Sequence, residues 1–158
     1  MGNRKSRPKE KAVLEFRYYE MPSDSHVMAL LGDRWILNYG REAVHFHNYL
    51  EIGYCYYGEG EMLLGQKRCP YHGGMFTVIP QNIPHRTCGK EKELSRWEYL
   101  FIDVPGFLQK VYRERPVQAQ RIIRHISEHF FIANEVQYPV LGRLIRGSLE
   151  EMREKKEL

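Results

Sequence analysis

Long apolar runs are missing from this sequence of 158 residues. No stretch reaches the roughly 18–20 residues that a membrane-spanning helix requires, and no apolar segment follows the charged N-terminus as it would in a signal peptide. Cysteine is also scarce: Cys55, Cys69 and Cys88 are an odd number with no paired spacing. This usage disfavours a secreted disulfide framework, so we expect a cytoplasmic protein without a membrane partner.

Strong charge of one sign is lacking as well, since the formal net charge is only +4. Much of it comes from residues 1–11, where the basic residues are Arg4, Lys5, Arg7, Lys9 and Lys11. We predict that this segment is a flexible, solvated basic arm rather than a nucleic-acid contact. The sequence has neither a helix-turn-helix pattern nor a concentrated basic face, so the chain by itself is not expected to recognise DNA.

Aromatic residues and turn residues are abundant, with 11 tyrosines and 13 glycines. In the first two thirds of the chain, short segments with strand character alternate with turns rich in glycine, proline and asparagine. These segments are residues 12–20, 27–31, 34–39, 45–57, 61–64, 75–79 and 94–103. Short strands at close, regular spacing are typical of a sandwich or barrel. We therefore predict one β-domain over residues 12–104.

The hydrophobic period changes after Pro105 from strand-like alternation to helical spacing. One amphipathic helix is predicted from Pro116 to Asn134 and a second from Pro139 onward. Their apolar stripes comprise Ala119, Ile122, Ile123, Ile126 and Phe130 in the first helix and Leu141, Leu144, Ile145 and Met152 in the second. We therefore predict a C-terminal extension of two helices over residues 105–158, able to pack on the β-domain or on a second copy of the chain.

The stretch from His45 to Glu51 carries the first cluster of chemically reactive side chains. His45 and His47 are two residues apart, so both side chains leave one face of an extended strand, and Glu51 shares their parity. A straight strand would hold Glu51 roughly 20 Å from His45, whereas the ligands of one metal ion lie only about 2.0–2.2 Å from it. We therefore predict that the chain reverses around Asn48 and Tyr49 in a hairpin that brings the three side chains together.

His85 is the fourth candidate ligand, because it follows the apolar strand at residues 75–79 and two prolines. Three imidazoles and one carboxylate suit a divalent first-row ion such as Zn, Ni, Fe or Mn, without selecting among them. The alternative is that the same four side chains are polar anchors that hydrogen-bond one another and a bound ligand.

Two spaced motifs are similar to those of the cupin superfamily: His45-x-His47-x3-Glu51-x6-Gly58 and Gly74-x5-Pro80-x4-His85. More closely, the first motif, together with a strand that ends Ile-Pro-x-x-x-Pro-His, resembles the N-terminal effector-sensing domain of AraC-type transcription regulators. The chain departs from the general cupin pattern at Asn82, where that pattern has Gly, and at Gly89, where it has Asn. The resemblance implies a mainly β fold, the cupin double-stranded β-helix or jelly-roll barrel, over residues 12–104.

The same resemblance implies an effector-binding and dimerisation domain of such a regulator, with the DNA-binding helix-turn-helix domain following residue 158. A small molecule, with a sugar as the first expectation, would enter the barrel mouth, and two copies would form a homodimer through the helical extension. The predicted ligand contacts are His45, His47, Glu51, Tyr57 and His85, with Trp35 and Trp97 as stacking aromatic side chains.

A second function class is a small metal-dependent cupin enzyme, such as a dioxygenase, isomerase or epimerase. It would use the same three histidines and Glu51 in Lewis-acid or redox chemistry. We favour the regulator and name no catalytic residue, because the sequence has no second acid–base pair at a telling spacing. The metal content of the purified chain and the reading frame after Leu158 would discriminate between the two classes.

Overall fold

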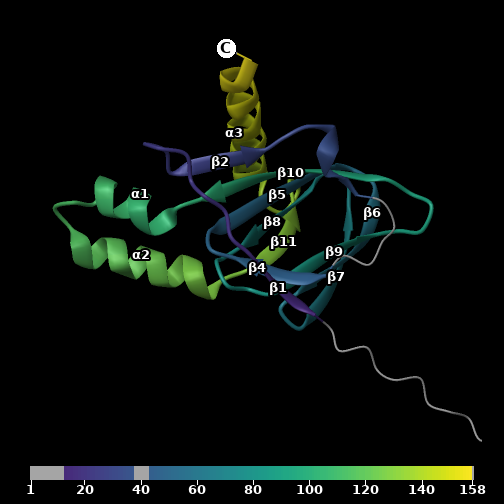
Figure 1. Ribbon diagram of the computed structural model, residues 1–158, viewed down its shortest axis with the longest axis horizontal. Coiled ribbons are helices and arrows are strands. Elements are labelled where there is room, and N and C mark those ends of the chain that lie inside the picture. Colours follow the sequence, from purple (N-terminus) through teal and green to yellow (C-terminus); the bar gives the residue numbers. More distant parts are fainter. Residues whose placement is uncertain (1–12, 38–42, 158) are drawn as a thin grey trace, which may run out of the picture.

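The computed structural model describes residues 13–37 and 43–157, which build two facing β-sheets with helices packed on them (Figure 1). One sheet has five strands in the order β1-β4-β9-β6-β7, and the other has six in the order β11-β8-β5-β10-β2, with β3 paired to β10. The strands are β1 (Leu14–Arg17), β2 (Val27–Leu30), β3 (Ile36–Leu37), β4 (Val44–His47), β5 (Leu50–Tyr57), β6 (Glu59–Leu64), β7 (Lys67–His72), β8 (Met75–Ile79), β9 (His85–Gly89), β10 (Ser95–Ile102) and β11 (Phe131–Asn134). The predicted basic arm at residues 1–11 lies outside the described residues.

Side chains that alternate along the strands fill the space between the two sheets. In β4, His45 and His47 are buried while Val44 and Phe46 are only half-buried, so the two histidines face inward. One core cluster between the sheets comprises Cys55, Met62, Leu64, Tyr71, Ile79 and Trp97. The mainly β, jelly-roll fold predicted from the sequence is confirmed.

The link between β4 and β5 reverses the chain around Asn48 and Tyr49 as predicted, but it is not a hairpin. β4 belongs to the five-stranded sheet and β5 to the six-stranded sheet, so the chain crosses from one wall of the barrel to the other. The Asn48 side chain fixes this link, because it donates a hydrogen bond to the carbonyl of Tyr19 and accepts one from the Tyr19 N–H, both at 2.9 Å. The histidines of β4 and the carboxylate of β5 therefore approach one another from opposite walls.

Beyond the barrel strands the described residues form three α-helices, one more than the sequence predicted. They are α1 (Val104–Val111), α2 (Pro116–Glu128) and α3 (Pro139–Glu157). The unpredicted α1 is capped by Asp103, whose carboxylate accepts a hydrogen bond from the Gly106 N–H at 3.0 Å. α2 ends at Glu128 instead of reaching Asn134, because the residues that follow form β11, which pairs with β8 of the six-stranded sheet.

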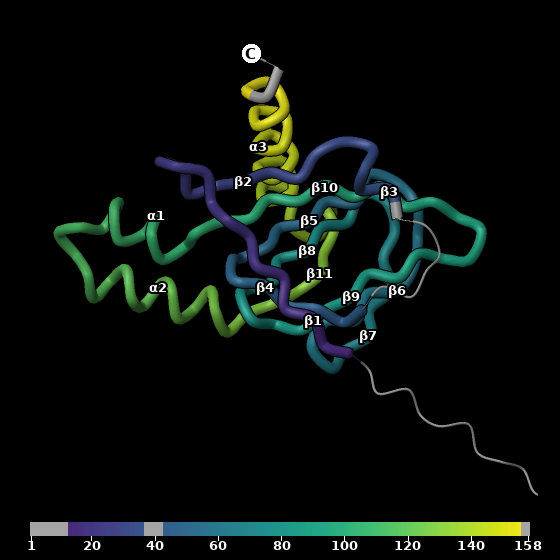
Figure 2. The backbone as a smooth tube through the Cα atoms, viewed as in Figure 1, coloured from purple at the N-terminus to yellow at the C-terminus, as the bar shows by residue number. Residues whose placement is uncertain are grey.

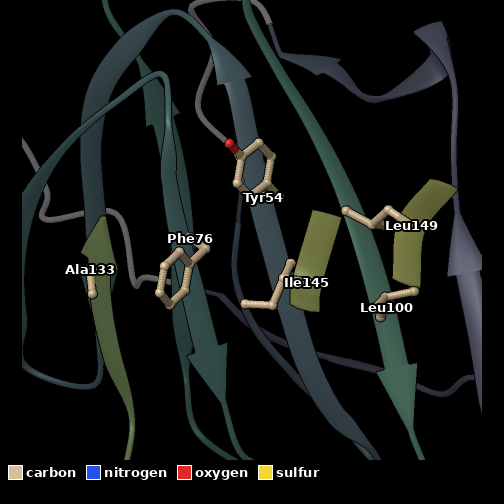
Figure 3. Packing of buried hydrophobic residues seen from close by; sticks show 6 residues of the cluster. All are labelled: Tyr54, Phe76, Leu100, Ala133, Ile145 and Leu149. Atoms are coloured by element: carbon tan, nitrogen blue, oxygen red, sulfur yellow. The ribbon is translucent and has the colours of Figure 1, made fainter. Parts of the chain in front are cut away.

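The helices pack on the barrel in two places. α3 lies on the outer face of the six-stranded sheet, where its buried residues Ile145 and Leu149 contact Phe76 and Leu100 (Figure 3). α1 and α2 lie side by side at one end of the sheets and pack around Leu50 (Figure 2). Among the residues that the structure describes, no helix is long and apolar enough to cross a membrane.

A buried carboxylate ties α3 to the sheet. Glu98 of β10 is 0% exposed, and its Oε2 accepts hydrogen bonds from the Tyr56 hydroxyl at 2.8 Å and from Arg153 of α3 at 2.5 Å. Its Oε1 accepts from the Gly32 N–H at 3.0 Å and from Arg96 at 3.2 Å. Burial alone would raise the pKa of Glu98, but these hydrogen bonds and the two guanidinium groups hold it below its ordinary value. The carboxylate is therefore ionised and fixes the orientation of α3.

Candidate ligand and metal site

Three side chains from three strands converge inside the barrel. His47 lies on β4, Glu51 on β5 and His85 on β9, and one ligand atom from each lies within 4.8 Å of the others. His47 Nε2 is 3.0 Å and His85 Nε2 is 3.6 Å from Oε2 of Glu51. All three residues are buried. The structure therefore brings together three of the four side chains that the sequence predicted to form the site.

The strand pairing explains this convergence. β4 and β9 are neighbours in the five-stranded sheet, and His45 and His85 are register partners, so their rings leave the same face. His47 is two residues further along β4 and therefore shares this face. Glu51 lies at the start of β5 in the opposite sheet, and its side chain points back across the interior.

His45 is beside this cluster, but its ring is not close to every member. Its ring centroid is 4.3 Å from that of His85 and 6.3 Å from that of His47. Burial, and then the neighbouring His85, lowers the pKa of His45 to about 4, so its imidazole is neutral at physiological pH. A neutral imidazole is the form that binds a metal.

Backbone carbonyls hold each of the three imidazoles in one orientation. Nδ1 of His45 contacts the Ala43 carbonyl at 3.1 Å, that of His47 the Tyr49 carbonyl at 2.9 Å, and that of His85 the Ile83 carbonyl at 2.8 Å. A carbonyl oxygen only accepts, so Nδ1 must carry the proton in each ring. In the neutral ring, Nε2 then keeps its lone pair. Such outer contacts typically orient histidines that ligate metals.

Glu51 completes a donor set that fits a divalent cation. Burial alone would raise the pKa of Glu51, but the imidazoles of His85 and His47 lower it far below its ordinary value, so the carboxylate is ionised. Without a cation, the 3.0 Å contact between His47 Nε2 and Glu51 requires an additional proton on the ring. A divalent ion would instead satisfy the carboxylate and the Nε2 lone pairs together, so the residues present fit a metal.

A cavity of about 170 Å³ opens beside this cluster. Its walls come from both sheets and from the 3-10 turn Asp33–Trp35. The lining residues are Arg17, Tyr19, Leu30, Arg34, Trp35, His45, Glu51, His85, Thr87, Tyr99 and Phe101. Trp35 meets Tyr99 edge to face, with ring centroids 6.1 Å apart, so the wall opposite the histidines is aromatic.

Two aromatic side chains that the sequence suggested as ligand contacts lie elsewhere. Trp97 is fully buried in the core cluster and stacks parallel to Tyr99 at 6.2 Å. Tyr57, at the end of β5, is 44% exposed and is not part of the cavity lining. Strand parity indicates which face a side chain takes, but not how far along the barrel it lies. Trp35, in contrast, does line the cavity.

Several lining residues were not identified from the sequence, among them the two arginines. Arg17 reaches the cavity because β1 pairs in parallel with β4, which makes Arg17 the register partner of His47. Arg34 reaches it from the 3-10 turn. In the sequence, Arg17 is marked only by lying two residues before Tyr19, which would place both side chains on one face of a strand. This spacing points to the cavity only when the pairing of β1 with β4 is known.

A second cavity, of about 190 Å³, lies where α2 meets the barrel. Tyr49 and Leu50 of the β4–β5 link form one side, and Ile123 and Ile126 of α2 form the other. Because the carbonyl of Tyr49 also accepts the hydrogen bond from His47, the helix and the histidine cluster contact the same short link.

Parts of this chain are similar to solved structures. Solved structures with a similar fold include a cupin 2 conserved barrel domain protein from Salinispora arenicola, with 18% identity over 54% of this chain and 71% of that chain and a TM-score of 0.43. Another is an oxalate decarboxylase from Bacillus subtilis, with 23% identity over 43% of this chain and 19% of that chain and a TM-score of 0.38. A third is fatty-acid-bound ToxT from Vibrio cholerae, with 12% identity over 53% of this chain and 31% of that chain and a TM-score of 0.35.

These similarities are distant, and the chain spans only about a fifth of the length of the decarboxylase. No curated protein matches the chain. The family model of the AraC-like ligand binding domain, however, matches residues 34–158, which is most of the sequence. The chain therefore belongs to the family of AraC-like ligand binding domains.

Proposed function

We propose that this chain is the effector-binding domain of an AraC-type transcription regulator and that the effector occupies the cavity beside the histidine cluster. The observation that carries the proposal is the cavity itself, which combines fixed polar groups on one wall with the aromatic residues Trp35 and Tyr99 on the other. Small-molecule sites typically have this composition. His45, Glu51 and His85 would contact the effector directly, and His47 would act through Glu51.

Ligand binding in the cavity would affect the packing of the helices through the β4–β5 link. A ligand that shifts Glu51 or His47 also shifts Tyr49, because the His47 ring donates to the Tyr49 carbonyl at 2.9 Å. Tyr49 and Leu50 in turn border the contact with Ile123 and Ile126 of α2. Ligand binding would thereby favour one packing arrangement of the helices over another, which is the differential interaction that a switch requires.

The helical region would also join two copies of the chain. Val140 and Leu144 of α3 are 66% and 62% exposed and lie four residues apart, so they form one apolar stripe on the helix. Val136 and Tyr138 just before the helix extend this exposed surface. In this proposal DNA is contacted by a region outside the 158 residues, and the protein works in the cytoplasm, as its cysteine usage suggests.

A ligand screen with two matched variants tests the proposed function. Thermal unfolding of the purified chain would be followed against sugars and small organic acids, and a true effector should raise the melting temperature in a saturable way. Trp35→Ala should abolish the shift, since Trp35 forms the cavity wall. Tyr57→Ala should preserve it, since Tyr57 lies outside the lining. A shift that Trp35→Ala leaves intact would contradict binding in this cavity.

The alternative function is a metal-dependent enzyme of the cupin type, favoured by the buried cluster of His47, Glu51 and His85. These residues, with His45 as a fourth ligand, would hold the ion. A bound Zn, Ni, Fe or Mn ion would polarise a ligand oxygen as a Lewis acid. Mass spectrometry of the bound molecule after incubation with metal-loaded protein separates the two functions, because an effector is recovered unchanged and a substrate is converted.

A further inference from the structure

We propose that the cavity between α2 and the barrel, which we call the α2 cavity, is a second ligand site and takes a small, uncharged, apolar molecule about the size of one aromatic ring. The site is separate from the cavity beside the histidine cluster and goes beyond the effector binding proposed for that cavity. Recognition in the α2 cavity rests on shape and apolar contact rather than on charge or hydrogen bonds.

α2 packs closely on its neighbours at one end and less closely at the other. Ala119, in the N-terminal half of the helix, is 1% exposed and belongs to the core cluster with Leu50, Val104 and Leu108. Ile126 lies two turns further along the same face of the helix, but it is only half-buried. The α2 cavity, of about 190 Å³, lies beside this less closely packed end.

Apolar side chains from β5, β10, α1 and α2 form most of the wall. They are Leu50, Ile102, Val104, Pro105, Ile123 and Ile126. The three isoleucines are half-buried, so part of their apolar surface is still accessible to a ligand. Removing such surface from water is favourable, and this gain provides the driving force for binding an apolar molecule.

Three polar side chains of the wall already have hydrogen-bond partners within the protein. Asn48 is paired with the backbone of Tyr19 as both donor and acceptor. The Ser127 hydroxyl donates to the carbonyl of Ile123 at 2.8 Å, and the Asp103 carboxylate caps α1. A ligand that needs hydrogen bonds from these groups would have to break a contact within the protein, whereas an apolar ligand leaves all of them intact.

The charge of the wall disfavours ionic ligands. Within the described part of the chain, the lining includes one acidic residue, Asp103, and no lysine, arginine or histidine. Asp103 would repel an anion. It is also engaged elsewhere, because its Oδ1 accepts from the Gly106 N–H at 3.0 Å and its Oδ2 lies 3.4 Å from Nδ1 of His26. An uncharged ligand therefore fits this wall better than an ion of either sign.

The volume of the α2 cavity limits the size of the ligand. An apolar cavity of about 150 Å³ binds benzene, and the α2 cavity is slightly larger at about 190 Å³. A single ring with a short alkyl group matches this space. A helix of a partner protein is about 10–12 Å wide with its side chains, so the cavity admits a small molecule and not a docked helix.

Titration with toluene tests the site, with the NMR signals of the Ile123 and Ile126 methyl groups as reporters. We expect saturable shifts of both signals with a dissociation constant on the order of 1 mM, within the ligand efficiency of very small ligands. Benzoate and benzylammonium present a similar ring with a negative or a positive group. Each should bind at least about tenfold more weakly than toluene, because the ionic group would lose hydration without gaining a partner.

Three variants locate the binding. Ile126→Phe fills the cavity and should weaken toluene binding at least about tenfold, because little free volume remains. Ile122→Phe makes the same change on the same helix outside the cavity lining and should leave the affinity unchanged. Trp35→Ala alters the wall of the cavity beside the histidine cluster and should also have no effect on toluene binding.

Melting temperatures without ligand show whether each variant is folded. If Ile126→Phe does not fold, Ile126→Ala provides the second test. The smaller side chain enlarges the cavity, so the preference should move about tenfold from toluene toward propylbenzene, with the Ile123 methyl signal as the reporter.

The inference is overturned if toluene at its solubility limit leaves the signals of Ile123 and Ile126 unchanged, or if either ionic analogue binds as tightly as toluene. Equal effects of Ile126→Phe and Ile122→Phe would also overturn it. Loss of toluene binding in Trp35→Ala would place the molecule in the other cavity and refute the α2 site. None of these results would count against the proposed effector site, because the two sites are tested through different walls.

Discussion

His47 Nε2 lies 3.0 Å from Oε2 of Glu51, although the two residues belong to different sheets. They are only four positions apart in the sequence, and the link around Asn48 carries the chain from one wall of the barrel to the other. This crossing gives a short local motif the ability to present groups from two walls. A displacement of this link would therefore also displace His47 and Glu51.

Metal binding should depend on His47, Glu51 and His85. After loading with Zn, Ni, Fe or Mn and dialysis, we expect close to one ion per chain by inductively coupled plasma mass spectrometry. His47→Ala, Glu51→Gln and His85→Ala should each weaken affinity by about 100-fold or more, since loss of an outer-sphere partner alone costs 10–100-fold. His45→Ala should cost less, because its ring lies 6.3 Å from that of His47.

His72→Ala is the matched control for these variants. His72 is an exposed histidine at the end of β7, outside the cluster, so its removal should leave the metal content unchanged. Equal loss of metal in His72→Ala and His85→Ala would point to nonspecific binding and contradict the assigned site.

The features that the sequence could predict are those encoded within one strand or one turn. The parity of His45 and His47, the reversal at Asn48 and the proline-flanked His85 are local. The short strands and turn residues predicted a sandwich or barrel, and the resemblance to cupins specified the jelly roll. The approach of Arg17 to the cavity depends on parallel pairing between β1 and β4, residues about thirty positions apart. No local spacing encodes such a pairing, so Arg17 was not predicted as a lining residue.

The segment around β11 shows a second feature that the sequence pattern could not predict. Phe131–Asn134 continues an apolar stretch after α2, and a short apolar run fits a helix end and a buried strand equally well. Pairing with β8 decides in favour of the strand, through partners such as Phe131 and Val78 that are more than fifty residues apart. The partners of the buried Glu98 could not be predicted for the same reason, since Arg153 follows it by 55 residues.

Glu98→Gln should destabilise the protein in a pH-dependent way. At pH 7 we expect a loss of about 2 kcal/mol, below the 3–5 kcal/mol of a fully buried pair because Arg96 and Arg153 are partly exposed. The fold lowers the pKa of Glu98 below 4.5, so the unfolded chain takes up the proton first as the pH falls. The contribution of the carboxylate is therefore complete above pH 4.5 and is lost as the pH falls through the folded-state value.

Urea unfolding at a series of pH values measures this effect. The difference in free energy of unfolding between wild type and Glu98→Gln should decrease as the pH is lowered from 7 to 3. Glu154→Gln on the exposed side of α3 is the control and should change stability by no more than about 0.5 kcal/mol at any pH. If this difference in free energy of unfolding stays constant down to pH 3, the negative charge of Glu98 is not what stabilises the fold.

Leu149 and Leu144 test whether α3 packs on the barrel, because one is buried and the other is exposed. Leu149 is fully buried against the six-stranded sheet, so Leu149→Ala should lower the free energy of unfolding by about 2–5 kcal/mol. Leu144→Ala makes the same chemical change on the exposed side and should cost no more than about 0.5 kcal/mol in the monomer. Similar losses at both positions, measured by urea unfolding at low protein concentration, would contradict the docking of α3 on the sheet.

Association through α3 should be broken by charge on its exposed stripe. Sedimentation velocity of the wild type should show a dimer, and the double variant Val140→Glu with Leu144→Glu should shift it to monomer, because two buried carboxylates per copy cannot be desolvated without partners. Arg143→Glu changes charge next to the stripe without removing apolar surface, and should leave most of the dimer intact. Since Val140 and Leu144 are 66% and 62% exposed in the single chain, the double variant should keep the wild-type circular dichroism spectrum and melting temperature at low concentration. A double variant that remains dimeric would exclude the stripe as the contact surface.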